Sequence, residues 1–263
     1  MASSTLKGIE LIMTNKQLYE AIFQRKSIRK FDMASLSPQT ITEMQSFTSE
    51  IKPLDKDIKY ELSYLCTNDV KNLLPIKAPH YICLYSEKKS NYLMNVGFIL
   101  QQIDLYLSAN DLGSCWLGMA KPSKQVAETK NGLEFVILLA FGNSNEPVHR
   151  TNIFEFKRNI MSSICNIPNA DELLQPVQLA PSASNTQPWF FSGSTDKITV
   201  SREKLNLIKA PLYGKMNQID IGIALTHLWL SCDHQGKSIK FDFEKTIAPS
   251  GYEFMTNVIV ESM

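Results

Sequence analysis

The chain has 263 residues, of which 44% are hydrophobic and 20% charged, so it can fill one large core or two smaller fused ones. Lysine and arginine total 27 against 26 aspartates and glutamates, and no basic stripe stands out, which argues against a nucleic-acid partner. Residues 1–16 hold no apolar run long enough for a signal peptide or a membrane span, so we expect a soluble, cytoplasmic protein.

Two helices are predicted before the first strand, at residues 17–25 and 37–48. Ser37 is a suitable cap for the second, and Pro38 fits its first helical position. Alternation and β-branched or aromatic content predict strands, which fall at residues 81–85, 114–117, 136–141, 197–200, 239–243 and 255–260. This mixture predicts an α+β or α/β sandwich.

A short repeat relates the two parts of the chain. The segment 132–135 (Gly-Leu-Glu-Phe) reappears at 251–254 (Gly-Tyr-Glu-Phe), and each copy opens an apolar, strand-like run. Upstream of the copies, residues 105–113 and 228–236 match in register and both end in glycine. A duplicated unit explains both matches.

Two long apolar segments are predicted to be buried helices. Residues 96–107 and 219–230 are apolar around the whole helical circumference, which calls for burial on every side. We expect these helices to pack against each other at the centre of a pseudo-twofold assembly; the alternative is two unrelated core helices. The polar stretch 146–156 contains Pro147 and marks the boundary, which gives halves of residues 1–150 and 151–263.

The five cysteines are scattered singly along the chain. None belongs to a C-x-x-C pair or has a histidine at ligand spacing, so neither a metal site nor a disulfide framework is expected. Cys83, Cys115 and Cys232 lie inside apolar runs and are predicted to be buried.

The segment Arg25-Lys26-Ser27-Ile28-Arg29 concentrates three cations and a hydroxyl. Guanidinium groups and a serine hydroxyl are the donors that a phosphate needs, and arginine stays charged at any working pH. Taken alone, such a cluster also fits a solvated helix end.

A second polar segment, residues 180–189 (Ala-Pro-Ser-Ala-Ser-Asn-Thr-Gln-Pro-Trp), is less ordinary. Two prolines restrict its backbone at both ends, and hydroxyls and amides crowd between them. Such donors and acceptors can read the polar edge of a planar heterocycle; the alternative is a polar loop of Asx and Ser turns.

These segments resemble motifs of the nitroreductase-like FMN flavoprotein family. Residues 25–29 look like its N-terminal phosphate motif, and residues 180–189 are similar to its Ala-Pro-Ser-x-x-Asn-x-Gln-Pro-Trp motif. Residues 220–224 (Asp-x-Gly-x-Ala) resemble its long interface helix, with His227 where Asn is common, and residues 112–118 resemble its segment beside the flavin ring. The resemblance implies the α+β fold of FMN-dependent nitroreductases.

The motifs are divided between the halves in a way that ordinary family members do not show. Those members carry every motif in one subunit and bind FMN at a homodimer interface. Here the phosphate motif lies in the first half and the proline-bounded loop in the second, whereas residues 50–60 lack the loop motif and no Arg-x-Ser-x-Arg precedes Ala180. This division resembles the tandem, single-chain branch of the family. It implies an intramolecular pseudo-dimer that holds one FMN and is a monomer or weak homodimer.

By resemblance, one group of residues would hold the phosphate of the cofactor and a second group its ring and ribityl chain. The phosphate group would be held by Arg25, Lys26, Ser27 and Arg29 and by the later pair Lys157 and Arg158, with Arg150 in reserve. The ring and ribityl chain would be contacted by Pro181, Ser182, Ser184 and Asn185, with Gln187 behind them, and by the backbone of Leu117 and Gly118. The pair at 157–158 fits a solvated basic turn equally well.

The resemblance implies an oxidoreductase that passes a hydride from NAD(P)H through FMN to an electron-poor small molecule such as a nitroaromatic or a quinone. It names no catalytic residue, because the cofactor does the chemistry and the protein positions it. His227 is expected to be a satisfied core residue. The alternatives are a flavin-binding protein with little turnover, a specialised member that cleaves flavin or dehalogenates, and a non-flavin interaction module.

Overall fold

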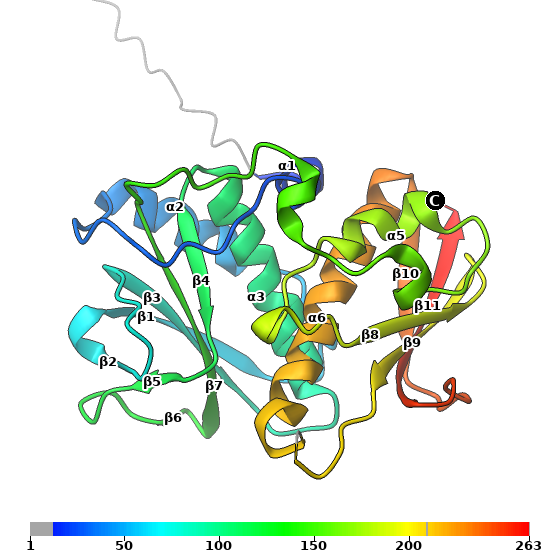
Figure 1. Ribbon diagram of the computed structural model, residues 1–263. Helices are drawn as coiled ribbons and strands as arrows, with labels where there is room; N and C mark the ends of the chain where they lie inside the picture. The colour runs from blue at the N-terminus through cyan, green and yellow to red at the C-terminus, as the bar shows by residue number, and fades with distance from the viewer. Residues whose placement is uncertain (1–12, 209, 263) are drawn as a thin grey trace, which may run out of the picture.

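The structure, a computed structural model, describes residues 13–208 and 210–262 (Figure 1). The part up to residue 142 contains the helices α1 (Asn15–Ile22), α2 (Pro38–Ser49) and α3 (Tyr92–Ala109) and the strands β1 (Tyr60–Cys66), β2 (Val70–Asn72), β3 (His80–Ser86), β4 (Gly113–Leu117), β5 (Ala120–Pro122), β6 (Thr129–Lys130) and β7 (Leu133–Gly142). The later part contains the helices α4 (Met161–Ile164), α5 (Asp171–Gln178) and α6 (Ala210–His234) and the strands β8 (Trp189–Gly193), β9 (Lys197–Glu203), β10 (Lys237–Asp242) and β11 (Tyr252–Ser262). Short 3-10 helices are η1 (Thr67–Asp69), η2 (Ile153–Phe156) and η3 (Ala183–Asn185).

The two larger sheets have the same strand order. The first runs β1-β3-β7-β4, with β6 pairing to β7, and the second runs β8-β9-β11-β10. Taken in chain order the strands therefore match one to one, and a long helix follows the second strand of each set. The repeated Gly-x-Glu-Phe segments begin β7 and β11, the two matched central strands. Strands β2 and β5 form a separate antiparallel ribbon.

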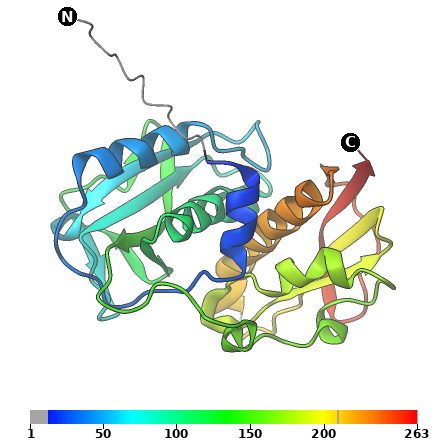
Figure 2. The same ribbon diagram turned by 90° about the horizontal axis from the view of Figure 1, so that it is seen from above.

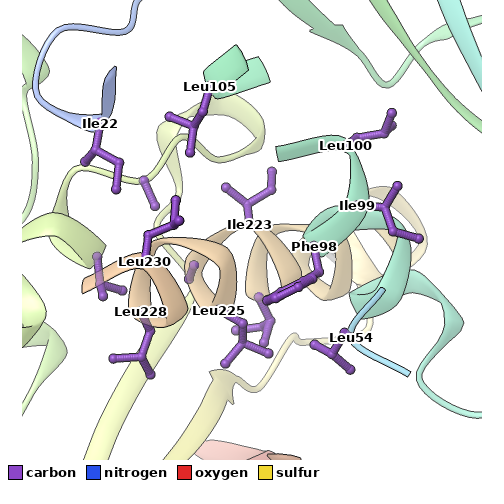
Figure 3. Close-up of a cluster of buried hydrophobic side chains, with 14 of the residues drawn as sticks. Ile22, Leu54, Phe98, Ile99, Leu100, Leu105, Ile223, Leu225, Leu228 and Leu230 are labelled. Carbon is purple, nitrogen blue, oxygen red and sulfur yellow. The ribbon is translucent and has the colours of Figure 1, made fainter. Parts of the chain in front are cut away.

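The helices α3 and α6 lie side by side between the two sheets (Figure 2). Residues 93–108 of α3 are all buried, as the apolar circumference of this segment predicts. Figure 3 shows the core that the helices share: Phe98 of α3 lies near Ile223 and Leu225 of α6. Ile22 brings α1 into the same core.

A reciprocal pair of glycines lets these helices approach closely. A Cβ added to Gly97 would lie 2.0 Å from the carbonyl oxygen of Ile219, and one added to Gly222 would lie 2.0 Å from that of Met94. Each glycine thus lies against the carbonyl group of the residue three positions before the other glycine. A side chain at either position would force the two backbones apart.

The helix starts follow their capping residues. Thr14 and Gln17 form a capping box at the start of α1. Ser37 caps α2, as predicted: its hydroxyl accepts a hydrogen bond from the Thr40 N–H, and Pro38 is the first residue of the helix. Helix α1 ends at Ile22, three residues earlier than the sequence predicts. The reason is that Arg25 leaves the helix to form a β-bridge with His149.

Cys83, Cys115 and Cys232 are buried, as predicted, and all five cysteines are free thiols. Burial raises the pKa of Cys83 and of Cys115 to about 11, so these thiols are held protonated. Within residues 13–208 and 210–262, no helix combines the length and apolar character needed to cross a membrane.

Candidate functional site

The basic segment 25–29 lies between β4 and the chain that follows β7. Ser27 forms a parallel bridge with Ser114, and the Ile28 N–H donates to the Ser114 carbonyl at 2.8 Å. On its other side, Arg25 bridges His149 and the Arg150 N–H donates to the Gln24 carbonyl at 2.8 Å. This backbone pairing brings Arg150 directly beside Arg25.

Arg25 is a buried cation held by a buried carboxylate. Its side chain forms an ion pair with Asp104 of α3 at 2.9 Å, with residue exposures of 1% for Arg25 and 0% for Asp104. Asp104 also accepts a hydrogen bond from the Ser114 hydroxyl. The Nη2 of Arg25 donates to the Ser27 hydroxyl at 3.0 Å, so two of the predicted phosphate-binding residues contact each other.

Two further arginines converge on the same place. The Arg150 guanidinium donates to the carbonyl oxygen of Arg25, and the Cζ of Arg150 lies 4.2 Å from the centre of the Phe156 ring. The guanidinium of Arg158 lies 5.7 Å from the centre of the same ring. We call Arg25, Arg150 and Arg158 the arginine cluster.

The positive charge of the arginine cluster is only partly compensated by Asp104 and Glu155. Burial lowers the pKa of Arg158 to about 9, and the charges of Arg25 and Arg150 act in the same direction. The pKa of Arg150 falls to about 10 through burial and the charge of Arg25, opposed by Glu155 and Asp104. Three converging guanidinium groups with this little compensation form a site that an anion would stabilise.

The proline-bounded loop attaches to the arginine cluster through Arg158. The Arg158 Nη1 donates to the Asn185 Oδ1 at 2.6 Å, and the Asn185 amide donates to the Lys157 carbonyl at 3.0 Å. The side-chain oxygen of Gln187 accepts a hydrogen bond from the Asn159 backbone N–H at 2.8 Å, and the backbone N–H of Gln187 donates to the Ser182 hydroxyl at 2.9 Å. The first of these contacts joins the proline-bounded loop to Arg158, one of the residues that the family resemblance assigns to the phosphate group.

The backbone of this loop is strained. Ser184, Asn185 and Gln187 have φ values of 51°, 58° and 50°, in the left-handed region. For residues with a side chain this conformation costs about 1 kcal/mol or more each, and such residues cluster at ligand sites. The surrounding hydrogen bonds hold the loop in a shape it would not adopt alone.

The N-terminal turns of α6 connect the loop to the end of β4. The Sδ of Met216 lies 2.8 Å from the position of a Cβ on Gly118, and Asp220 accepts the Ala183 N–H at 3.0 Å. Burial raises the pKa of Asp220 to about 8, opposed by the Ala183 hydrogen bond. The second oxygen of Asp220 and the Oδ1 of Asn217 are buried without a hydrogen-bond partner. The sequence analysis assigned no site role to Asn217, Asp220 or Met216.

The predicted site residues thus divide into those that converge and those that do not. The residues at or attached to the arginine cluster are Arg25, Ser27, Arg158, Ser182, Asn185 and Gln187, joined by Arg150. Lys26 turns away and donates to the Pro147 carbonyl at 3.1 Å. The Arg29 side chain is exposed, and its charge acts to lower the pKa of Cys115. The Lys157 side chain is also exposed, and only its backbone carbonyl contacts the loop, where it accepts from the Asn185 amide.

Three other kinds of feature could mark a site: a histidine, a cluster of metal ligands and a surface groove. His227 is a buried core residue, as predicted, and its pKa falls to about 3, chiefly through burial. No group of three or more His, Cys, Asp or Glu side chains in the described ranges is placed to hold a metal ion. Two surface grooves, one beside Lys204 and Tyr252 and one beside Lys71 and Lys121, include none of the predicted site residues.

Comparisons with known proteins identify the family. A family model described as "Putative TM nitroreductase" matches residues 17–232, which is most of the chain. The chain belongs to this nitroreductase family. The solved structure of a Thermotoga maritima protein described as a "putative nitroreductase" has a TM-score of 0.64 and 20% identity, covering 98% of this chain and 99% of its own. That likeness shows a nitroreductase fold.

Solved structures of other nitroreductases match about half of the chain. An FMN-dependent nitroreductase from Clostridium difficile is 16% identical over 54% of this chain and 93% of its own, with a TM-score of 0.41. A nitroreductase with bound FMN from Desulfitobacterium hafniense is 13% identical over 57% of this chain and 100% of its own, with a TM-score of 0.41. No curated protein sequence matches the chain.

Proposed function

We propose that this nitroreductase-family chain is an FMN-dependent oxidoreductase that takes a hydride from NAD(P)H and reduces an electron-poor small molecule such as a nitroaromatic or a quinone. The observation that carries the proposal is the arginine cluster joined to the proline-bounded loop through the contact between Arg158 and Asn185. A phosphate cradle and an amide-rich loop at one place match a flavin mononucleotide.

The arginine cluster fits the phosphate of FMN. A phosphate carries up to two negative charges and several acceptor oxygens, which three guanidinium groups and the Ser27 hydroxyl can satisfy. The Nε of Arg158 is buried without a hydrogen-bond partner and is one donor still available. Arg25, Arg150 and Arg158 would therefore hold the phosphate, with Asp104 fixing Arg25.

The remaining residues would bind and orient the ring. Pro181, Ser182, Ser184 and Asn185 would face it from one side, and the backbone of Leu117 and Gly118 from the other. Asp220 holds the loop in place through the Ala183 N–H. When bound, FMN supplies the hydride chemistry; the protein orients it, and water delivers protons.

We infer that the chain is a fused pair of related halves, residues 1–150 and 151–263, with one FMN between them. The shared strand order and the reciprocal glycines support this division. A further parallel is that Asn95 of α3 accepts the backbone N–H groups of Leu54 and Asp55, much as Asp220 of α6 accepts that of Ala183. The segment at 54–55 has the position of the loop without its sequence, which leaves one site.

Reconstitution with FMN tests the proposal. We expect the purified protein to acquire flavin absorbance bands that remain after gel filtration, at one FMN per chain, and NADH or NADPH to bleach them without oxygen. Arg25→Ala should weaken binding strongly, whereas Lys26→Ala, whose side chain points to Pro147, should not. Reconstituted protein without flavin bands would rule the proposal out.

Met216 favours a second candidate, a flavin-binding protein with little turnover. Its sulfur lies 2.8 Å from the position of a Cβ on Gly118, a residue that the resemblance assigns to the ring. Flavin bands that neither NADH nor NADPH bleaches would favour this alternative, and rapid bleaching followed by acceptor reduction would exclude it.

A further inference from the structure

A buried chain of hydrogen bonds runs from α5 across α6 and α3 to Arg25. His227 Nδ1 lies 2.8 Å from the Pro176 carbonyl oxygen, and its Nε2 lies 3.1 Å from the amide nitrogen of Gln101. The same amide nitrogen lies 3.2 Å from the Oδ2 of Asp104, which forms the ion pair with Arg25. We call His227, Gln101 and Asp104 the relay.

The direction of every bond in the relay is fixed by chemistry. A carbonyl oxygen can only accept, so the proton of His227 is on Nδ1 and its Nε2 is an acceptor. Gln101 must then use both hydrogens of its amide as donors, one to His227 and one to Asp104. Burial, reinforced by the charges of Arg25 and Arg158, lowers the pKa of His227, and the Pro176 hydrogen bond opposes them. The imidazole is therefore neutral, as this arrangement requires.

The relay fixes the position of the Gln101 amide against Asp104 from both sides. The Gln101 amide nitrogen is held between two acceptors, His227 Nε2 and Asp104 Oδ2. Without the His227 acceptor, one amide hydrogen would be buried unpaired and only Asp104 would fix the amide, so the bond that holds Asp104 toward Arg25 would be less firmly positioned. Each member has an exposure of 0%, so water cannot replace the lost bond.

We infer that His227 is a positioning residue of the phosphate site, which acts through Gln101 and Asp104 to hold Arg25 in its phosphate-binding orientation. This inference rests on the proposed function. It also ties the site to α5: the relay starts at the Pro176 carbonyl, and Arg158 donates to the Leu179 carbonyl at 3.0 Å. Two arginines of the cluster are thus anchored at the end of the helix that leads into the proline-bounded loop.

Comparing FMN with riboflavin separates positioning from general packing, because riboflavin lacks the phosphate. His227→Leu removes both hydrogen bonds and should weaken FMN binding about tenfold or more while leaving riboflavin binding within about twofold. His227→Gln, which retains one donor and one acceptor, should restore most of the FMN affinity. Gln101→Leu breaks the relay one step nearer Arg25 and should have the same effect as His227→Leu. It serves as the test if the His227→Leu protein does not fold.

The outcomes distinguish the inference from the function beneath it. Wild-type protein that binds neither ligand, or binds both equally, overturns the proposed phosphate site itself. Wild-type protein that prefers FMN, with a preference unchanged in His227→Leu or Gln101→Leu, overturns the positioning role alone. An equal loss for both ligands would show that His227 only packs the core.

Discussion

Replacing Gly222 by alanine tests the close approach of α3 and α6. The added methyl group would lie 2.0 Å from the Met94 carbonyl oxygen and 2.8 Å from the Phe98 nitrogen, both backbone atoms of the other helix. Ordinary contact begins near 3.4 Å, so the helices must separate locally by about 1.4 Å. Backbone atoms cannot rotate away as a side chain could.

The expected cost is large for one methyl group. Overpacking a core costs about 1–3 kcal/mol, and a clash with backbone belongs at the upper end of that range. Alanine regains about 1 kcal/mol of helix propensity over glycine. We therefore expect Gly222→Ala to lower the free energy of unfolding by about 2 kcal/mol, measured by urea denaturation followed by circular dichroism.

Gly214 provides the matched control in the same helix. A Cβ at this position meets nothing within 4 Å, so Gly214→Ala should gain up to about 1 kcal/mol from propensity alone. The reasoning is refuted if Gly222→Ala is as stable as the wild-type protein, or if the two variants shift stability in the same direction.

Three further predictions concern the site. Arg158→Met should weaken FMN binding about tenfold or more and reduce the dependence of that binding on salt, because a half-buried charge-assisted donor is lost. Fluorescence titration at two ionic strengths checks this. Lys157→Met, which changes an exposed side chain, should alter the affinity little. Asp220 has a folded-state pKa of about 8, above its ordinary value of 3.8, so its protonated form stabilises the fold below about pH 4 and that contribution is lost as the pH rises toward 8. The unfolding free energy of the wild-type protein should therefore fall relative to that of Asp220→Asn across this range, by up to about 5 kcal/mol; parallel curves in urea denaturation at pH 5 and 8 would contradict the burial argument. Ser184→Gly should raise the unfolding free energy of the ligand-free protein by about 1 kcal/mol, since glycine tolerates a φ of 51° without strain; an unchanged or lower melting temperature would show that the loop is relaxed.

Much of the fold could be predicted because its central elements have strong patterns. The helices α3 and α6 are apolar on all sides, and only a position between two layers satisfies such a segment. The Gly-x-Glu-Phe repeat marks the matched strands β7 and β11. By contrast, α5 escaped prediction, because Pro176 lies inside it and argues against a helix.

The candidate site was predictable in its segments but not in its geometry. The basic segment and the proline-bounded loop have distinctive compositions, whereas the place of Arg150 depends on the backbone pairing of Arg25 with His149. The choice between Lys157 and Arg158 depends on a left-handed φ of 51° at Lys157, which a lysine does not signal in sequence. The buried partner Asp104 lies in the middle of an apolar helix and is recognisable only once Arg25 is beside it.

Arg150 and Arg158 both lie in the connector between the last strand of the first sheet and the helices of the second part. If the arginine cluster binds the phosphate as proposed, the covalent join is itself a component of the binding site. Cleavage of the chain between these two arginines would therefore distribute the anion ligands over two fragments, even if each fragment kept its own sheet. If the chain is a fused pair as proposed, its two halves need not be identical: the first supplies Arg25 and Arg150, and the second supplies Arg158 and the proline-bounded loop.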